Sequence, residues 1–195
     1  MTSSEAPAVA LEVKITIVDS DVTADGKLPL VVQFTESGTL VELAGGATAA
    51  CNGVQLSWNG LGYAARVPQV AAGGQYEVSH LREGVSTTVV VTAPPRPVIT
   101  SPVAQELVPR SAALPISFVA AGAPRVRVLA TAPNGMVRGE PQADSGLITL
   151  DARSLSAGAG TLTLTRELEG KLSGTGFHAA TFAYSVDRQV PVVWQ

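Results

Sequence analysis

Three aspartates near the N-terminus, Asp19, Asp21 and Asp25, form the densest carboxylate group in the sequence. Hard cations such as Ca²⁺ take several oxygen ligands, and alternate aspartates followed by Gly26 could begin a loop that supplies them. The spacing matches no EF-hand loop, however, and the other ligands are missing. Because Asp and Gly are also ordinary turn residues, we expect a solvated turn between two strands. The sequence predicts no structural metal and no cofactor, and these aspartates are the one candidate metal site.

The two histidines and the single cysteine do not form a zinc site or a nucleophilic centre. His80 and His178 are isolated in the sequence, whereas zinc needs three or four clustered ligands. Cys51 has no adjacent base, which a reactive thiolate requires. We expect strand histidines on half-exposed faces and an inert, buried or half-buried thiol. The sequence contains no Gly-x-Ser-x-Gly, His-Glu-x-x-His or P-loop motif, so it predicts no catalytic residue and no enzyme.

Positive charge is concentrated in the second half of the chain, at Arg125, Arg127, Arg138, Arg153 and Arg166. Arg125 and Arg127 share one face of a predicted strand and could bind carboxylates of a partner through paired hydrogen bonds. The alternative, which the sequence favours, is a solvated sheet face whose charges discourage edge-to-edge pairing. Aromatic residues make up only 5% of the chain, and Trp194 is the one that could offer a ring to a sugar.

Composition limits the class of protein. The 195 residues are 46% hydrophobic and 15% charged, with a formal net charge of −3. Disordered chains combine low hydrophobicity with high net charge, so this chain is folded. It has no clustered basic face for nucleic acid. No apolar run approaches the roughly 20 residues that span a bilayer. A single cysteine excludes an intrachain disulfide and by itself leans toward the cytoplasm.

Alternating apolar residues predict strands along the whole chain. The pattern is strict over residues 9–17 and returns in both halves, and each asparagine precedes a glycine, which is typical of turns. Residues 167–176 are predicted to be a polar loop. Residues 177–194 are either one long bulged strand or a pair of strands.

Four prolines within residues 93–102 divide the chain. Proline fixes φ and removes a backbone donor, so no central strand or helix runs through this segment. We predict a short, stiff linker at residues 94–97, between one β-sandwich at residues 9–93 and a second at residues 98–195.

Residues 1–8 are small and polar and are predicted to be a flexible tether. Two interpretations are open. The segment is either an ordinary frayed terminus or the start of a mature exported protein. In the second case it is similar to the region that follows the lipidated cysteine of bacterial lipoproteins.

The run from Gly73 to Pro97 resembles the last two strands of fibronectin type III and bacterial immunoglobulin-like modules. In such modules a tyrosine opens the penultimate strand as a tyrosine corner, a role that Tyr76 could take. Val78 stands where antibody-type domains carry their second cysteine, so the disulfide subtype is excluded. The sequence VITSP at residues 98–102 resembles the opening strand of bacterial surface modules. The resemblance implies an all-β fold of two tandem immunoglobulin-like antiparallel β-sandwiches joined by a short Pro-rich linker.

This fold predicts a non-enzymatic bacterial protein that acts outside the cytoplasm, in the periplasm, on the outer surface or after secretion. The expected role is a surface, stalk or protein-interaction module, with a protein partner or a surface polymer and no nucleic acid. Membrane attachment would come only through an N-terminal lipid anchor, as in a lipoprotein, that is absent from this sequence. The alternative is a carbohydrate-binding accessory module of a secreted enzyme system, in which Trp194 would contact the sugar.

Overall fold

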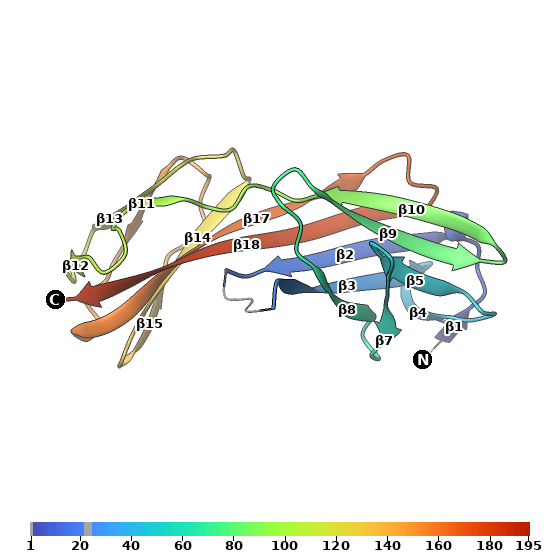
Figure 1. Ribbon diagram of the computed structural model, residues 1–195, viewed down its shortest axis with the longest axis horizontal. Coiled ribbons are helices and arrows are strands. Elements are labelled where there is room, and N and C mark those ends of the chain that lie inside the picture. Colours follow the sequence, from blue (N-terminus) through green and yellow to red (C-terminus); the bar gives the residue numbers. More distant parts are fainter. Residues whose placement is uncertain (1, 22–24) are drawn as a thin grey trace. The chain divides into compact units, whose positions relative to one another are not determined.

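The computed structural model describes residues 2–21 and 25–195, and nearly all of its regular structure is β (Figure 1). The all-β class predicted from the sequence is confirmed. Among the described residues, no helix is long and apolar enough to cross a membrane. The 3-10 turn is η1 (Ala8–Ala10), and the strands are β1 (Thr2–Ser4), β2 (Leu11–Asp19), β3 (Lys27–Glu36), β4 (Thr39–Leu43), β5 (Thr48–Cys51), β6 (Val54–Gln55), β7 (Ser57–Trp58), β8 (Tyr63–Pro68), β9 (Gln75–Arg82), β10 (Val85–Thr92), β11 (Ile99–Ser101), β12 (Leu107–Val108), β13 (Leu114–Phe118), β14 (Arg125–Ala132), β15 (Gly135–Arg138), β16 (Leu147–Leu150), β17 (Gly158–Leu172) and β18 (Ala179–Trp194).

The chain folds into two compact units, and each is discontinuous in sequence. Unit 1 contains Met1–Asp19, Thr23–Pro94 and Glu169–Tyr184, and unit 2 contains Ser20–Val22, Pro95–Leu168 and Ser185–Gln195. Strands β17 and β18 therefore supply residues to both units. Residues 169–184, which the sequence assigns to the second sandwich, lie in unit 1. The tandem arrangement itself stays a prediction.

Unit 1 has the strand order of an immunoglobulin-like sandwich. One sheet contains β2-β3-β8-β7, which corresponds to strands A-B-E-D, and the other contains β10-β9-β5-β6, which corresponds to G-F-C-C′. Two additions extend the first sheet. The hairpin end of β17 and β18 continues it beside β2, and β1 pairs in parallel with β4 at the end of β3.

The core of unit 1 follows from the alternation seen in the sequence. Alternate residues of β2 are buried, beginning with Leu11, because period-two side chains point to one face of a strand. Phe34 of the first sheet lies 5.8 Å from His80 of the second, measured between ring centroids, and 5.8 Å from Tyr63. The two sheets thus bury one aromatic and aliphatic layer between them, as expected of a sandwich.

Unit 2 has a similar strand order, with an added A′ strand and no D strand among its described residues. Its sheets are β11-β13-β16, corresponding to A-B-E, and β12-β18-β17-β14-β15, corresponding to A′-G-F-C-C′. Residues from both sheets form one buried core, which includes Ile116, Phe118, Val128, Ile148, Leu164 and Trp194. Each unit taken by itself is therefore an immunoglobulin-like β-sandwich.

Two local expectations differ from the structure, and one open alternative is decided by it. Thr2–Ser4 of the expected tether forms β1, whereas Met1 lies outside the described residues. The polar loop predicted at residues 167–176 is shorter, because β17 continues to Leu172 with polar side chains on a strand paired to β18. Residues 179–194 form the single strand β18, which decides between the one-strand and two-strand interpretations.

Tyr76 forms the tyrosine corner that the resemblance implies. It lies at the start of β9, the F strand, and its hydroxyl accepts a hydrogen bond of 3.1 Å from the backbone N–H of Val70. Its ring is fully buried and lies 6.1 Å from the ring of Tyr184. Burial also raises the pKa of Tyr76 above its usual value, so the hydroxyl stays protonated. The corner fixes the chain segment that leads into the F strand.

We expect Tyr76→Phe to lower the free energy of unfolding by about 0.5–1.5 kcal/mol, because the half-buried Val70 N–H loses its acceptor while the ring remains. Urea denaturation of the full chain measures this loss. Tyr63→Phe is the comparison. It also removes a tyrosine hydroxyl that accepts a backbone hydrogen bond, from the Leu43 N–H at 2.8 Å, but at a place outside the corner. A Tyr76→Phe protein as stable as the wild type would contradict a structural role for the corner.

Candidate functional site

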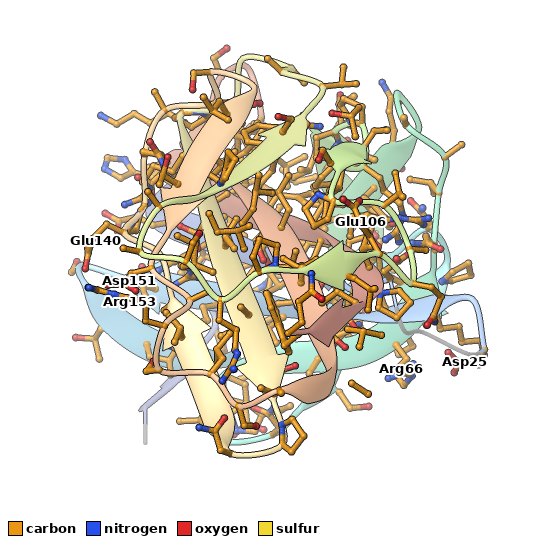
Figure 2. All side chains as sticks on the ribbon, turned by 90° about the vertical axis from the view of Figure 1, so that its left-hand side faces the viewer. Asp25, Arg66, Glu106, Glu140, Asp151 and Arg153 are labelled. Atoms are coloured by element: carbon orange, nitrogen blue, oxygen red, sulfur yellow. The ribbon has the colours of Figure 1, made fainter. Side chains whose placement is uncertain are left out.

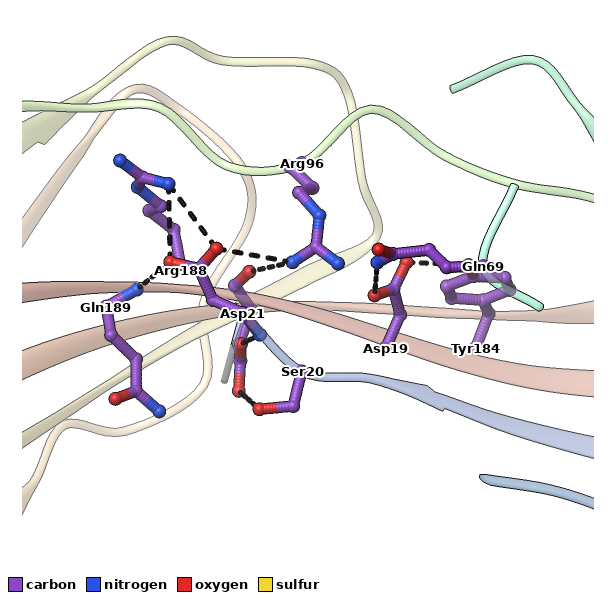
Figure 3. A network of polar contacts seen from close by, with 9 residues as sticks. Asp19, Ser20, Asp21, Gln69, Arg96, Tyr184, Arg188 and Gln189 are labelled. Atoms are coloured by element: carbon purple, nitrogen blue, oxygen red, sulfur yellow. Dashed lines mark hydrogen bonds and ion pairs between the residues drawn. The ribbon is translucent and has the colours of Figure 1, made fainter. Parts of the chain in front are cut away.

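Asp19 is a structural carboxylate inside unit 1. It stands at the end of the buried face of β2 and is only 4% exposed. Its two oxygens accept hydrogen bonds of 2.5 Å from the Gln69 side-chain amide and 3.1 Å from the Tyr184 hydroxyl (Figure 3). The two hydrogen bonds satisfy a carboxylate that the sandwich buries, as is usual for buried polar groups.

Asp21 belongs to a polar network of unit 2. Its carboxylate lies 3.3 Å from the guanidinium of Arg188 and 3.7 Å from that of Arg96, and it accepts a hydrogen bond of 3.2 Å from the Gln189 N–H (Figure 3). The Asp21 N–H in turn donates to Asp187 at 2.6 Å. Two guanidinium groups beside one carboxylate repel a metal cation, so this network is a cross-linked turn.

Asp25 forms an exposed ion pair with Arg66 at 2.8 Å, and Figure 2 shows the two side chains together. The hydrogen bond from Arg66 holds the pKa of the Asp25 carboxyl below its usual value. Each of the three candidate aspartates therefore has its own partners. Among residues 2–21 and 25–195, no group of three or more His, Cys, Asp or Glu side chains could hold a metal ion.

Arg125 and Arg127 lie on the outer face of β14, as the alternation predicts, and both pair with Glu167 of β17. Glu167 is directly opposite Arg125 in the ladder, and its Oε2 lies 3.8 Å from the Arg125 Nε. It also forms a close ion pair with Arg127. The arginine side chains remain 48% and 39% exposed. Cross-strand pairs of opposite charge stabilise a sheet modestly, which suits a solvated face.

The outer face of the G-F-C-C′ sheet of unit 2 contains a hollow of about 260 Å³, which we call the Arg127 hollow. Its polar lining comes from four neighbouring strands and consists of Arg127, Arg138, Thr163, Thr165, Asp187 and Gln189. Two guanidinium groups beside hydroxyl and amide groups can bind a carboxylate or another acidic group. The described lining contains no aromatic side chain. Of the predicted interaction residues, only Arg127 lines this hollow.

Trp194 does not offer an exposed ring, which corrects its assignment as a sugar contact. The side chain is 1% exposed in the core of unit 2, and its indole N–H donates a hydrogen bond of 2.8 Å to the Thr131 carbonyl. Gly160 leaves the space for this contact, because a Cβ at that position would overlap both the indole and the carbonyl. Trp194 is buried because it continues the alternate apolar positions of β18.

His80 is fully buried, so its expected place on a half-exposed face is wrong. It is 1% exposed and lies between Phe34 and Phe177, with ring centroids 5.8 and 6.3 Å away. Burial, together with the charge of Arg82, lowers the pKa of His80. Cys51 is also buried, as predicted, and burial raises the pKa of its thiol to about 12, which keeps it unreactive.

Arg166 is the polar residue whose structural role the sequence analysis missed. Its side chain is 2% exposed and pairs at 3.1 Å with Asp144, whose side chain is fully buried. The same guanidinium donates to the carbonyls of Pro95 and Arg96 at 3.3 Å and makes a close bond to that of Val119. The signal was present in the sequence, because Arg166 occupies the apolar face of its strand, in register with Leu162 and Leu164.

No family model matches the chain, and no curated protein matches its sequence. Among solved structures, it is similar to the fibronectin(III)-like modules of Clostridium thermocellum CbhA, with 13% identity, coverage of 93% of this chain and 94% of that chain, and a TM-score of 0.31. It is also similar to the I9–I11 tandem of titin, with 10% identity, coverage of 95% and 66%, and a TM-score of 0.31. Domains 4 and 5 of the S-layer protein SbsC give 18% identity, coverage of 88% and 83%, and a TM-score of 0.25. The strand orders described above, and not these low TM-scores, establish the immunoglobulin-like fold.

The burial of His80 predicts a loss of stability in mild acid. Because the native state holds the pKa of His80 below its usual value of 6.5, the unfolded chain binds a proton that the native protein excludes. The free energy of unfolding therefore decreases as the pH falls below about 6.5, with a slope of at most about 1.4 kcal/mol per pH unit from this one group. Urea denaturation between pH 7.5 and 5 should show this slope in the wild type and lose it in His80→Leu. His178→Leu, at an exposed position, is the control that should retain it.

The buried pair of Arg166 and Asp144 predicts a second, larger effect. Arg166→Met keeps most of the side-chain volume but leaves the Asp144 carboxylate buried without its cation, so we expect a loss of about 3–5 kcal/mol. The double variant Arg166→Met/Asp144→Asn should recover part of this loss, because it removes the uncompensated charge. Denaturant unfolding of all four proteins in the cycle measures the coupling. Additive single effects would show that the pair has no specific interaction.

Proposed function

We propose that this protein is a non-enzymatic bacterial module that acts outside the cytoplasm as a surface or stalk element under mechanical tension. The immunoglobulin-like topology of each unit is compatible with this role but does not by itself give a function. The lipid anchor suggested by the N-terminal composition stays a prediction.

The observation that supports a load-bearing role is the parallel pairing of β12 with β18 in unit 2. Leu107 lies opposite Val193 and Val108 opposite Trp194. Four flanking backbone bonds continue this ladder. They are Gln105 N–H to Pro191 O at 2.8 Å, Val193 N–H to Glu106 O at 3.0 Å, Gln195 N–H to Val108 O at 3.0 Å and Arg110 N–H to Gln195 O at 3.2 Å. The ladder joins an early strand of the unit to its last strand.

Parallel pairing determines how these bonds respond to force. Tension applied before β12 and after β18 pulls the two strands past each other along their length, because they point in the same direction. All bonds of the ladder then carry the load at once, whereas a ladder pulled from one end breaks bond by bond. Such a sandwich unfolds slowly under force, and forced unfolding is governed by the unfolding rate.

We further propose that the Arg127 hollow is where this module contacts a partner. Arg127 and Arg138 favour an acidic group on a protein or a surface polymer, and the hollow is too small for more than a side chain or one substituent of a polymer. The carbohydrate-binding alternative loses its proposed aromatic contact with the burial of Trp194. A neutral sugar would have hydroxyl, amide, guanidinium and carboxylate groups to bind in this hollow, but no aromatic ring among the lining residues.

Single-molecule pulling of the full chain tests the load-bearing role. In a Cys51→Ala background, cysteine handles at Val98 and Gln195 load the ladder in shear, and handles at Ser111 and Gln195 peel it from one end. We expect a higher unfolding force for the first pair. In the first geometry, Val193→Pro should lower the force, because it removes the N–H that donates to Glu106 O beside β12. The Val193 N–H points toward β12, so the pairing of β18 with β17 loses no donor.

Equal forces in the two pulling geometries would overturn the load-bearing function. So would an unchanged force in Val193→Pro, provided that the variant unfolds in denaturant at nearly the wild-type midpoint. Titration with an acidic polysaccharide and with a neutral one of similar length separates the partner chemistry. Binding that requires Arg127 and is specific to the acidic polymer supports the hollow as the contact.

A further inference from the structure

Strand β10 forms an open edge of unit 1. It ends the sheet order β10-β9-β5-β6, and among the described residues no strand pairs with its outer side. In unit 2 the equivalent G strand, β18, is covered on that side by β12. In unit 1 the chain that precedes the A strand forms η1 instead, and Pro7 and Ala8 line a hollow of about 400 Å³ beside Val85 and Thr87.

The ladder with β9 shows which groups of β10 point outward. Val85 pairs with Arg82 across the two-residue turn Glu83-Gly84, so hydrogen-bonded pairs alternate from there along the hairpin. Beyond the hairpin, the Ala93 N–H donates to Gly74 O at 2.8 Å, which fits the same alternation. The backbone N–H and C=O groups of four residues therefore point away from β9. These residues are Ser86, Thr88, Val90 and Thr92.

The edge of β10 lacks the protection that several other edges have. Exposed edges are usually blunted by charge, proline or short length, because unpaired backbone groups recruit another strand. β6 and β7 are two residues long, β15 ends in Arg138, and the unit 1 end of β17 carries Glu169 and Lys171. β10 has eight residues, VSTTVVVT, with neither charge nor proline.

We propose that β10 pairs antiparallel with β10 of a second copy of this chain, which forms a two-fold symmetric dimer. The G-F-C-C′ sheets of the two unit 1 sandwiches then join into one sheet through their edges. This surface is distinct from the β12–β18 ladder and the Arg127 hollow, so it adds to the proposed function and does not depend on it.

The strand sequence specifies one register for this pairing. When Val89 lies opposite Val89 of the second copy, Thr88 meets Val90 and Ser86 meets Thr92, and the converse pairs form by symmetry. All four outward residues of each strand are then paired, and each pair exchanges two N–H···O bonds. Pairs between β-branched residues, and between serine and threonine, are favourable neighbours across strands.

A second copy fits this edge better than an unrelated partner. An interface with a different protein gains its specificity from complementary charges or from an anchoring pocket. VSTTVVVT has no charged side chain, and the hollow beside Val85 and Thr87 lies only at the end of the strand nearest the turn. Self-pairing needs only a strand whose residues form favourable pairs with the same strand running in the opposite direction. The absence of charge in β10 also removes the like-charge repulsion that a symmetric contact would otherwise double.

Sedimentation velocity and hydrogen exchange of the full chain test the proposal. We expect a monomer–dimer equilibrium between about 1 μM and 1 mM, as for small interfaces. With rising concentration, exchange should slow at the amides of Ser86, Thr88, Val90 and Thr92. The amides of Thr87 and Val89 point toward β9 and should be protected at every concentration.

Thr88→Pro should abolish the dimer, because it removes an outward donor, while the ladder with β9 keeps all its bonds. Thr149→Pro is the matched control. Thr149 is an exposed threonine on the edge strand β16. Because the Phe118 N–H donates to Gly146 O at 2.9 Å, the alternation makes Pro115 and Thr149 a non-hydrogen-bonded pair, so the Thr149 N–H also points outward. This variant should leave the dimer intact. If Thr88→Pro does not fold, Thr88→Lys provides the same test by placing a charge on the edge.

A chain that stays monomeric up to 1 mM overturns the proposal. So does a dimer that survives both Thr88 variants, or one in which the four outward amides exchange at a rate independent of concentration. Open-ended assembly into larger species also overturns it, because a symmetric β10 contact closes after two copies.

Discussion

The guanidinium of Arg166 is the contact on which the architecture of unit 2 depends. One buried side chain from β17 binds the carbonyls of Pro95 and Arg96, the carbonyl of Val119 and the carboxylate of Asp144. Asp144 also accepts from the N–H groups of Ala121 and Ala123 at 3.0 and 3.1 Å. The Pro-rich connector, the turn after β13 and the segment before β16 are thus held by one charge pair. Its geometry must be maintained, because a buried charge without its partner costs several kcal/mol.

The alternation of buried and exposed positions along each strand explains which residues could be predicted from the sequence and which could not. Period-two alternation located the strands and most of the core, including Leu11, Val13 and Ile116, because burial of one strand face leaves a direct record in the sequence. The errors fall at polar or terminal members of the same alternations. Asp19 follows Ile17, His80 follows Val78, and Trp194 follows Val192 at a spacing of two, and all three are buried. The position of a residue in the strand alternation, more than its type, determines whether it is buried. Most of the buried polar side chains then bind polar partners within the fold.

Which segments belong to each unit could not be predicted from local sequence patterns. Prolines near residues 94–97 mark a place where a strand cannot continue, and the change of unit between Pro94 and Pro95 lies there. The transfer of residues 169–184 to unit 1 depends instead on the pairing of β18 with β2, which joins segments more than a hundred residues apart. Glu167, Glu169 and Lys171 resemble a polar loop because local preference is weak compared with the backbone bonds of a hairpin. Long-range pairing has no signature in a single sequence.

The two sandwiches share a strand order but differ in how the G strand is protected. In unit 2, Leu107 and Val108 form a short A′ strand that satisfies the outer side of β18, and the bonds at Glu106 and Gln195 extend it. In unit 1, Pro7 cannot donate to a ladder, and the chain there closes into η1 through the bond from the Ala10 N–H to Pro7 O at 2.9 Å. Among residues 2–21 and 25–195, no strand therefore pairs with the backbone groups on the outer side of β10. Because folding places the same topological edge in both units and covers only one of them, the difference between the two is a property of the sequence before β2 and not of the fold.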